Sequence, residues 1–181
     1  MRIMFSLSVI ANVFFSLPVF GQVHFTDVTD TSGIKHVFKV YEGMFGGGAC
    51  AMDFNNDGYE DLYITGGMNN DVLYKNNGNG SFTNVFEQSE LSITKNFVTQ
   101  GVCGADINRD GYVDLLITTI TSRIKKEVIP RDLNLLFLNN GNGTFRDVTT
   151  EFGLDQMYSF STGGSFGDFN ADGWPDIYIG N

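Results

Sequence analysis

Three short acidic segments of this sequence carry side chains that could bind a metal ion. Each reads Asp-x-Asn-x-Asp-Gly-x-x-Asp, and the first residues are Asp53, Asp106 and Asp168. Carboxylate and amide oxygens are the ligands that Ca²⁺ takes, about six to eight at a time and in flexible geometry. The predicted ligands are the side chains at positions 1, 3, 5 and 9 and the backbone carbonyl at position 7: Asp53, Asn55, Asp57, Tyr59 and Asp61; Asp106, Asn108, Asp110, Tyr112 and Asp114; Asp168, Asn170, Asp172, Trp174 and Asp176.

The density of carboxylates favours a bound cation over a solvated acidic turn. Two carboxylates about 4 Å apart repel by roughly 4 kcal/mol at an effective dielectric constant of about 20. Ligand oxygens without His or thiolate disfavour zinc and copper, and magnesium prefers fewer protein ligands. We therefore predict about three Ca²⁺ sites. Asn56, at position 4 of the first loop, is expected to point outward and not to be a metal ligand.

EF-hands and dockerins begin with the same residues, but their loops lie between helices. An EF-hand also needs a bidentate Glu at position 12. Position 12 here is Ile64, Ile117 and Ile179, and the neighbouring residues are strand formers. The loops are therefore expected to join β-strands.

Each loop belongs to a longer repeat that predicts four strands. A Gly-rich segment of small apolar residues precedes the loop, and an apolar run such as 62–64 or 115–117 follows it. Two repeats continue into hairpins with Asn-Gly turns at 77–80 and 140–143, where both residue types tolerate positive φ. The first aspartates lie 53 and then 62 residues apart. Four strands at this period are typical of propeller blades.

A third repeated element is a Phe-x-Asp/Asn-Val tail, which begins at Phe25, Phe82 and Phe145. With the loops and hairpins, it resembles the FG-GAP/VCBS repeats of calcium-binding β-propellers, and the tail is similar to the ASPIC/UnbV (cartilage acidic protein-like) group. The resemblance implies an all-β fold, a partial β-propeller of four-stranded antiparallel blades with calcium loops between strands A and B. Rings of this family hold more blades than this chain supplies, so an N-terminal fragment is expected.

The expected organisation is a signal peptide at 1–21 followed by an incomplete propeller at 22–181. Within the propeller we expect an isolated strand D at 24–30, and then blades at 44–86 and 97–150. A partial blade with strands A and B alone is expected at 159–181.

The first residues are typical of a secretory signal. Arg2 precedes an apolar stretch at 3–20, which Pro18 interrupts, and Gly21 closes a small-residue cleavage site. A membrane anchor is the alternative, although the stretch is short for a span. We therefore expect a secreted or cell-surface protein, periplasmic or extracellular in a bacterium, with no membrane span in the mature chain. A net charge of -10 argues against nucleic acids and anionic membrane surfaces as partners.

The predicted function is extracellular binding or adhesion, with an unknown protein or carbohydrate as ligand. The alternatives are a structural spacer and the non-catalytic propeller domain of a larger secreted enzyme, whose catalytic part lies beyond residue 181. The chain itself is not expected to be an enzyme, because His24 and His36 have no nucleophile or metal partner nearby in sequence. Cys50 and Cys103 occupy equivalent repeat positions and are expected to be small core residues more than a disulfide.

Overall fold

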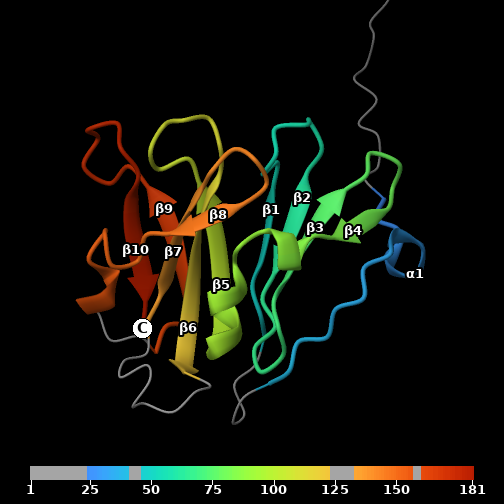
Figure 1. Ribbon diagram of the computed structural model, residues 1–181, viewed down its shortest axis with the longest axis horizontal. Helices are drawn as coiled ribbons and strands as arrows, with labels where there is room; N and C mark the ends of the chain where they lie inside the picture. Colours follow the sequence, from blue (N-terminus) through green and yellow to red (C-terminus); the bar gives the residue numbers. More distant parts are fainter. Residues whose placement is uncertain (1–23, 41–45, 123–132, 157–159) are drawn as a thin grey trace, which may run out of the picture.

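The computed structural model describes residues 24–40, 46–122, 133–156 and 160–181. These residues form two four-stranded antiparallel sheets and one two-stranded ribbon, in which the strands follow sequence order (Figure 1). This arrangement confirms the predicted all-β fold of partial propeller blades. The first sheet contains β1 (Ala49–Met52), β2 (Asp61–Ile64), β3 (Val72–Asn76) and β4 (Phe82–Asn84); the second contains β5 (Phe97–Ala105), β6 (Asp114–Ser122), β7 (Leu135–Asn139) and β8 (Phe145–Asp147); the ribbon contains β9 (Gly163–Gly167) and β10 (Asp176–Gly180).

Helical structure in the described segments is limited to single turns. The one α-helical turn is α1 (Thr29–Ser32), and the 3-10 turns are η1 (Phe86–Gln88), η2 (Ser92–Asn96) and η3 (Leu154–Gln156). None of the described helices is long and apolar enough to cross a membrane. The expected signal peptide at 1–21 lies outside the described residues.

The three units share one register, which makes their acidic loops equivalent. Cys50 pairs with Tyr63 in the first sheet, and Ser165 pairs with Tyr178 in the ribbon. Cys103 pairs with Leu116 at the same place in the second sheet. Each acidic loop therefore connects the first two strands of its unit.

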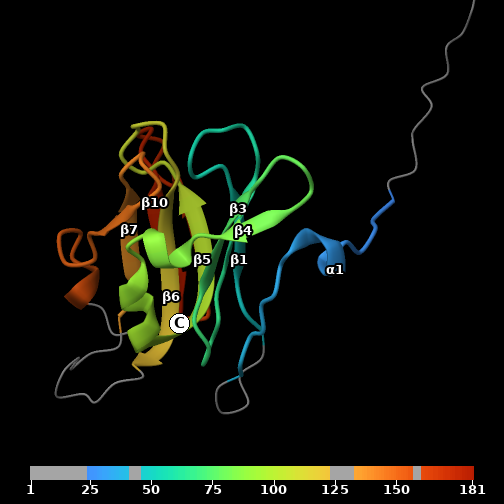
Figure 2. The ribbon, with the colours of Figure 1, turned by 45° about the vertical axis from the view of Figure 1, so that its right-hand side comes forward.

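The first strands of the three units lie side by side, in the order β1, β5, β9 (Figures 1 and 2). Glycines allow this close approach. A Cβ added at Gly48 would lie 2.7 Å from the amide nitrogen of Val102, and one added at Gly101 would lie 2.9 Å from Cα of Gly163. The Gly-rich segments seen in the sequence are therefore contact points between neighbouring units.

Two apolar cores lie between the units. The larger core joins the first two sheets, with Tyr63 and Leu73 on one side and Leu115 and Phe137 on the other. The smaller core joins the second sheet to the ribbon through the buried side chains of Leu116 and Leu136, with half-buried residues of β9 and β10 packed against them. Packing between neighbouring sheets therefore holds the units together.

The strand expected over residues 24–30 is not formed. The described residues before Thr29 are irregular, and α1 follows, with Gly33 in the left-handed conformation at its end. An Asp27 carboxylate oxygen accepts the Thr29 N–H at 2.9 Å, a local bond that favours a turn. The equivalent tails form β4 and β8 because β3 and β7 lie beside them. No such strand C lies beside residues 24–28 in the described structure, and Phe25 is 96% exposed.

Both cysteines are free thiols, as expected of small core residues. Cys50 packs against the larger core and Cys103 against the smaller one. Burial raises the pKa of both thiols, to about 11 for Cys103. They are therefore protonated near neutral pH and act as apolar packing groups.

Candidate metal-binding loops

The three acidic loops lie at the same end of the sheets (Figure 1). In each, the carboxylate at position 1 accepts two backbone amides. Oδ1 of Asp53 accepts the N–H of Asp57 at 3.0 Å, and Oδ2 accepts the N–H of Gly58 at 2.7 Å. Asp106 and Asp168 accept the equivalent amides in the second and third loops. The backbone of each loop therefore curls around the side chain of its first aspartate.

Positions 3 and 5 also turn their oxygens toward the loop backbone. Oδ1 of Asn55 accepts the N–H of Asp57 at 3.0 Å, and Oδ1 of Asp57 accepts the N–H of Tyr59 at 3.1 Å. The same two bonds recur in the other loops, at Asn108 and Asp110 and at Asn170 and Asp172. The three loops therefore have the same internal hydrogen-bond pattern.

The carboxylate at position 9 anchors the loop to the third strand of its unit. Asp61 is fully buried; its Oδ2 accepts the N–H of Phe54 at 3.2 Å, and its Oδ1 accepts the N–H of Asn76 at 2.7 Å. Asp114 is bound in the same way. Oδ2 of Asp176 accepts the N–H of Phe169 at 2.9 Å, but no third-strand amide reaches its Oδ1 among the described residues.

Two positions in each loop have positive φ. The glycine at position 6 allows the bend of the loop: Gly58, Gly111 and Gly173 have φ between 87° and 90°. The positive φ at position 4 is not predicted by the sequence pattern. It is 55° at Asn56, 63° at Arg109 and 59° at Ala171. Only Asn56 carried a signal, because Asn tolerates this conformation better than Arg or Ala.

Side chains at position 4 also connect neighbouring loops. The Asn56 side-chain amide donates to the carbonyl of Gly111 at 3.0 Å. The Arg109 guanidinium lies over the Trp174 ring, 3.9 Å from its centroid. Asn56, which is expected to point away from its own loop, thus reaches the second loop.

The aromatic residue at position 7 packs against the hairpin turn of its own unit. A Cβ added at Gly78 would lie 2.7 Å from the Tyr59 ring, and one added at Gly141 would lie 2.7 Å from the Tyr112 ring. These turn positions favour glycine because of their positive φ, and a Cβ there would also displace the tyrosine ring. The position-7 amide also donates to the position-5 carboxylate, so this part of the backbone lies beside the loop carboxylates.

The buried carboxylates at position 9 of the first two loops have raised pKa values. Burial raises the pKa of Asp61, and the charges of Asp57 and Asp53 raise it further, against amide bonds that lower it. Burial likewise raises the pKa of Asp114 to about 6, with Asp110 and Asp106 adding to the effect. A cation in either loop would relieve this repulsion.

Lys75 neutralises part of the charge of the first loop. Its Nζ lies 3.2 Å from Oδ2 of Asp57. Desolvation acts to raise the pKa of Asp57, but the bond from Lys75, the Tyr59 amide and Asn55 together lower it. Both side chains are partly exposed, so this ion pair contributes little to stability.

The predicted side-chain ligands at positions 1, 3 and 5 of each loop turn an oxygen toward the amides of the same loop. No group of three or more acidic, His or Cys side chains in the described segments has the spacing of a formed metal cluster. Backbone amides of the loops are bonded to several of the predicted ligand oxygens. An oxygen that accepts one amide keeps a second lone pair for a metal. The oxygen-only donor set and the mutual repulsion of the carboxylates therefore fit Ca²⁺. The ligand assignments, including the three position-7 carbonyls, stay predictions.

An acidic loop between the first two strands of a four-stranded sheet, repeated along adjacent inner strands, defines a class of β-propeller repeat. The chain matches the model of the FG-GAP-like repeat over residues 53–117 and 128–179. It belongs to this family.

Curated relatives match over part of the chain. Cartilage acidic protein 1 of Xenopus tropicalis is 46% identical over 48 residues, which are 26% of this chain and 7% of the relative. The Mus musculus protein of the same name gives the same identity and coverage. Integrin alpha-4 of Xenopus laevis is 32% identical over 82 residues, 43% of this chain and 8% of the relative. The chain thus spans a small part of each relative, and the resemblance to the cartilage acidic protein-like group is confirmed.

Proposed function

We propose that the chain is a calcium-binding β-propeller module that acts in extracellular binding or adhesion. One Ca²⁺ would be held by each loop, through the side chains at positions 1, 3, 5 and 9 and the position-7 carbonyl. The observation that carries the proposal is the hydrogen-bond pattern shared by the three loops, which folds each loop around its first carboxylate. In the first two loops, burial and the charges of neighbouring carboxylates also raise the pKa of Asp61 and Asp114.

Bound Ca²⁺ supplies the positive charge that offsets carboxylate repulsion in the loops. The chain's residues fix the geometry: Asp61 and Asp114 tie their loops to the third strands, and Asn56 ties the first loop to the second. Calcium would then favour the folded arrangement of neighbouring units, because binding to the folded state alone stabilises it. The role is structural, and it keeps a binding surface in place.

Two further considerations support an extracellular role. The relatives are named for cartilage and for an integrin α chain. The predicted signal peptide at 1–21 fits the same setting. The unidentified partner would be an extracellular protein or a carbohydrate, to be found by screening protein and glycan arrays with and without calcium.

Thermal unfolding in calcium and in chelator tests the metal sites. At calcium 100-fold above Kd, one site adds about 2.7 kcal/mol to the free energy of unfolding. We expect a clear rise in Tm with calcium. An unchanged Tm would refute the proposal.

A matched pair of variants tests the ligand register. Asp57→Asn removes a charged ligand, whereas Glu60→Gln removes one charge from an exposed position of the same loop. Calorimetric titration should show one site weakened or lost in the first variant, and the full number of sites in the second. Equal effects would show that net charge, and not ligand position, governs binding.

A further inference from the structure

The side chain at position 4 of the first loop reaches one particular peptide bond of the second loop. The Asn56 side-chain amide donates to the carbonyl of Gly111 at 3.0 Å. This carbonyl belongs to the same peptide bond as the N–H of Tyr112, which donates to Oδ1 of Asp110 at 2.9 Å. One peptide bond of the second loop is therefore held at both ends, by the first loop at its oxygen and by a predicted ligand of its own loop at its nitrogen.

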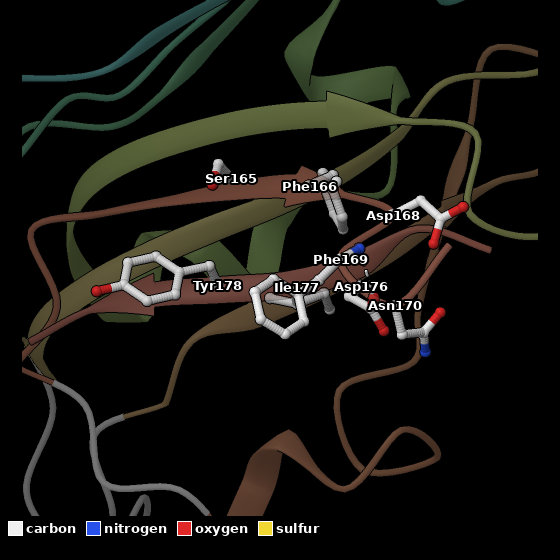
Figure 3. A pocket seen from close by; sticks show the side chains of 9 residues that line it. Ser165, Phe166, Asp168, Phe169, Asn170, Asp176, Ile177 and Tyr178 are labelled. Carbon is white, nitrogen blue, oxygen red and sulfur yellow. Dashed lines mark hydrogen bonds between the residues drawn. The ribbon is translucent and has the colours of Figure 1, made fainter. Parts of the chain in front are cut away.

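The second and third loops meet at the same positions through a different contact. The Arg109 guanidinium lies over the Trp174 ring, 3.9 Å from its centroid, and a Cβ added at Gly173 would lie 2.9 Å from Nη2 of Arg109. The Trp174 N–H donates to Oδ1 of Asp172 at 2.8 Å. The other predicted side-chain ligands of this loop lie at the same end of the ribbon (Figure 3): Asp168, Asn170 and Asp176. In both pairs of loops, a position-4 side chain thus contacts the residues whose backbone holds the position-5 carboxylate.

Position 4 makes these contacts from a left-handed backbone conformation. φ is 55° at Asn56 and 63° at Arg109, and this conformation costs free energy in residues other than glycine. Such residues persist where the surrounding structure determines their conformation. In each loop, position 4 lies between predicted ligands at positions 3 and 5. The contact therefore joins the ligand-bearing segment of one loop to that of the next.

We propose that Asn56 and Arg109 are positioning residues for the calcium site of the loop that follows their own. This inference rests on the proposed function, because it concerns metal binding by the same loops. Without a cation, the carboxylates of a loop repel one another, which favours open forms of the loop. Hydrogen bonds in a chain polarise one another, so the bond from Asn56 makes the Tyr112 N–H a stronger donor to Asp110. A larger fraction of closed loops raises the apparent affinity for calcium in proportion.

The peptide bond at the centre of the argument can be observed directly. The sequence Gly-Tyr occurs twice in the chain, at 58–59 and 111–112. Labelling the full chain with carbonyl-¹³C glycine and ¹⁵N tyrosine therefore gives two selected amide signals by NMR, Tyr59 in the first loop and Tyr112 in the second. In chelator, the Tyr112 signal should shift in the Asn56→Gly variant, because its peptide bond loses a donor. This readout needs no bound metal.

Calcium titrations of the labelled chain and of the Asn56→Gly variant test the effect on affinity. Glycine keeps the left-handed conformation available and removes only the side-chain amide. We expect the calcium midpoint at Tyr112 to rise by about two- to tenfold, the change that one ordinary hydrogen bond allows. The midpoint at Tyr59, in the loop that carries the substitution, should change less.

The Arg109→Lys variant gives a second test at the third loop. It keeps the charge but loses the planar stacking on the indole. Trp174 is the chain's only tryptophan, so its fluorescence reports calcium binding at the third loop. We expect its calcium midpoint to rise by about two- to fivefold, as loss of an exposed cation–π contact allows. The midpoint at Tyr112, in the substituted loop, should stay unchanged.

The two titrations separate failure of this inference from failure of the proposed function. If the unaltered chain gives no calcium response at Tyr59, Tyr112 or Trp174, the proposed function is wrong and this inference falls with it. If calcium shifts all three signals but neither substitution moves the midpoint of the following loop, only the inference is overturned. A larger change in the substituted loop than in the following loop would also refute it, because position 4 would then serve its own loop.

Discussion

The hydroxyl of Tyr63 donates a 2.6 Å hydrogen bond to the carboxylate of Asp71, and both residues are buried. The other carboxylate oxygen accepts the N–H of Gly66 at 2.7 Å and the hydroxyl of Thr99 at 2.5 Å. Thr99 belongs to β5, so this buried carboxylate joins the first sheet to the second. Asn134 holds the equivalent place in the second sheet and donates to Ser161, just before the ribbon.

Removing the hydroxyl of Tyr63 should destabilise the protein. Tyr63→Phe leaves a buried carboxylate oxygen without its donor, which costs about 1–3 kcal/mol. Tyr59→Phe is the matched control, because Tyr59 is exposed and its loss of a hydroxyl should change stability by less than about 0.5 kcal/mol. Urea unfolding followed by circular dichroism measures both. Similar values for the two variants would contradict the assigned role of the buried pair.

Asp71 should make stability fall as pH rises. Burial raises its pKa above the ordinary 3.8, against donors that lower it. The folded protein therefore holds this proton more tightly than the unfolded chain. The resulting stability is fully present below pH 3.8 and is lost as pH rises through the raised folded pKa.

The Asp71→Asn variant, which imitates Asn134, should remove this part of the pH dependence. Its free energy of unfolding at a single pH can be lower, since an amide cannot accept all three donors. The slope above about pH 4 is the diagnostic quantity, and the loop carboxylates titrate alike in both proteins. Identical slopes in the two proteins would show that Asp71 does not titrate differently on folding.

At Asn56, glycine should be tolerated better than alanine. Both variants lose the hydrogen bond to Gly111, worth about 0.5–1.5 kcal/mol. Alanine also bears the cost of positive φ, about 1 kcal/mol, whereas glycine does not. Equilibrium unfolding of the two variants in chelator gives the order directly. A glycine variant less stable than the alanine variant would argue against the left-handed conformation at this position.

Two glycines of the inner strands form another matched pair. Gly101→Ala places a Cβ 2.8 Å from the Thr118 hydroxyl and 2.9 Å from Cα of Gly163, and such overpacking costs about 1–3 kcal/mol. Gly163→Ala meets nothing within 4 Å. Differential scanning calorimetry should therefore show a lower Tm for the first variant alone. Equal Tm values would mean that the strands separate easily.

Much of the fold could be predicted because the repeat combines several independent signals. The spacing of acidic residues identified the loops that begin at Asp53, Asp106 and Asp168. The apolar runs and the Asn-Gly turns predicted the strands on either side of them. The failure at 24–30 has a physical cause, since a strand needs a neighbour and local bonds form where none lies beside it. Residues equivalent to Phe25 form strands in the two complete sheets.

Contacts between units could not be predicted in the same way. The reach of Asn56 to Gly111 depends on the backbone conformation at position 4, and Arg109 and Ala171 adopt that conformation without any sequence signal. The role of Asp71 was also missed, because a single Asp before a strand gives no indication of burial. Both depend on how neighbouring sheets are placed, which the period of the repeat does not specify.

The inner glycines also determine how the sheets can be arranged. Near Gly48 and Gly101 the units meet backbone to backbone, whereas elsewhere the rings of Phe54 and Phe145 lie between the first two units, with centroids 6.2 Å apart. The units therefore approach each other more closely at the inner glycines than where large side chains lie between them, and each unit acts as a wedge. Stacked wedges curve toward their thin side. The curvature of the array is thus set by a gradient of side-chain size, and larger residues at the inner glycines would open it toward a flat stack.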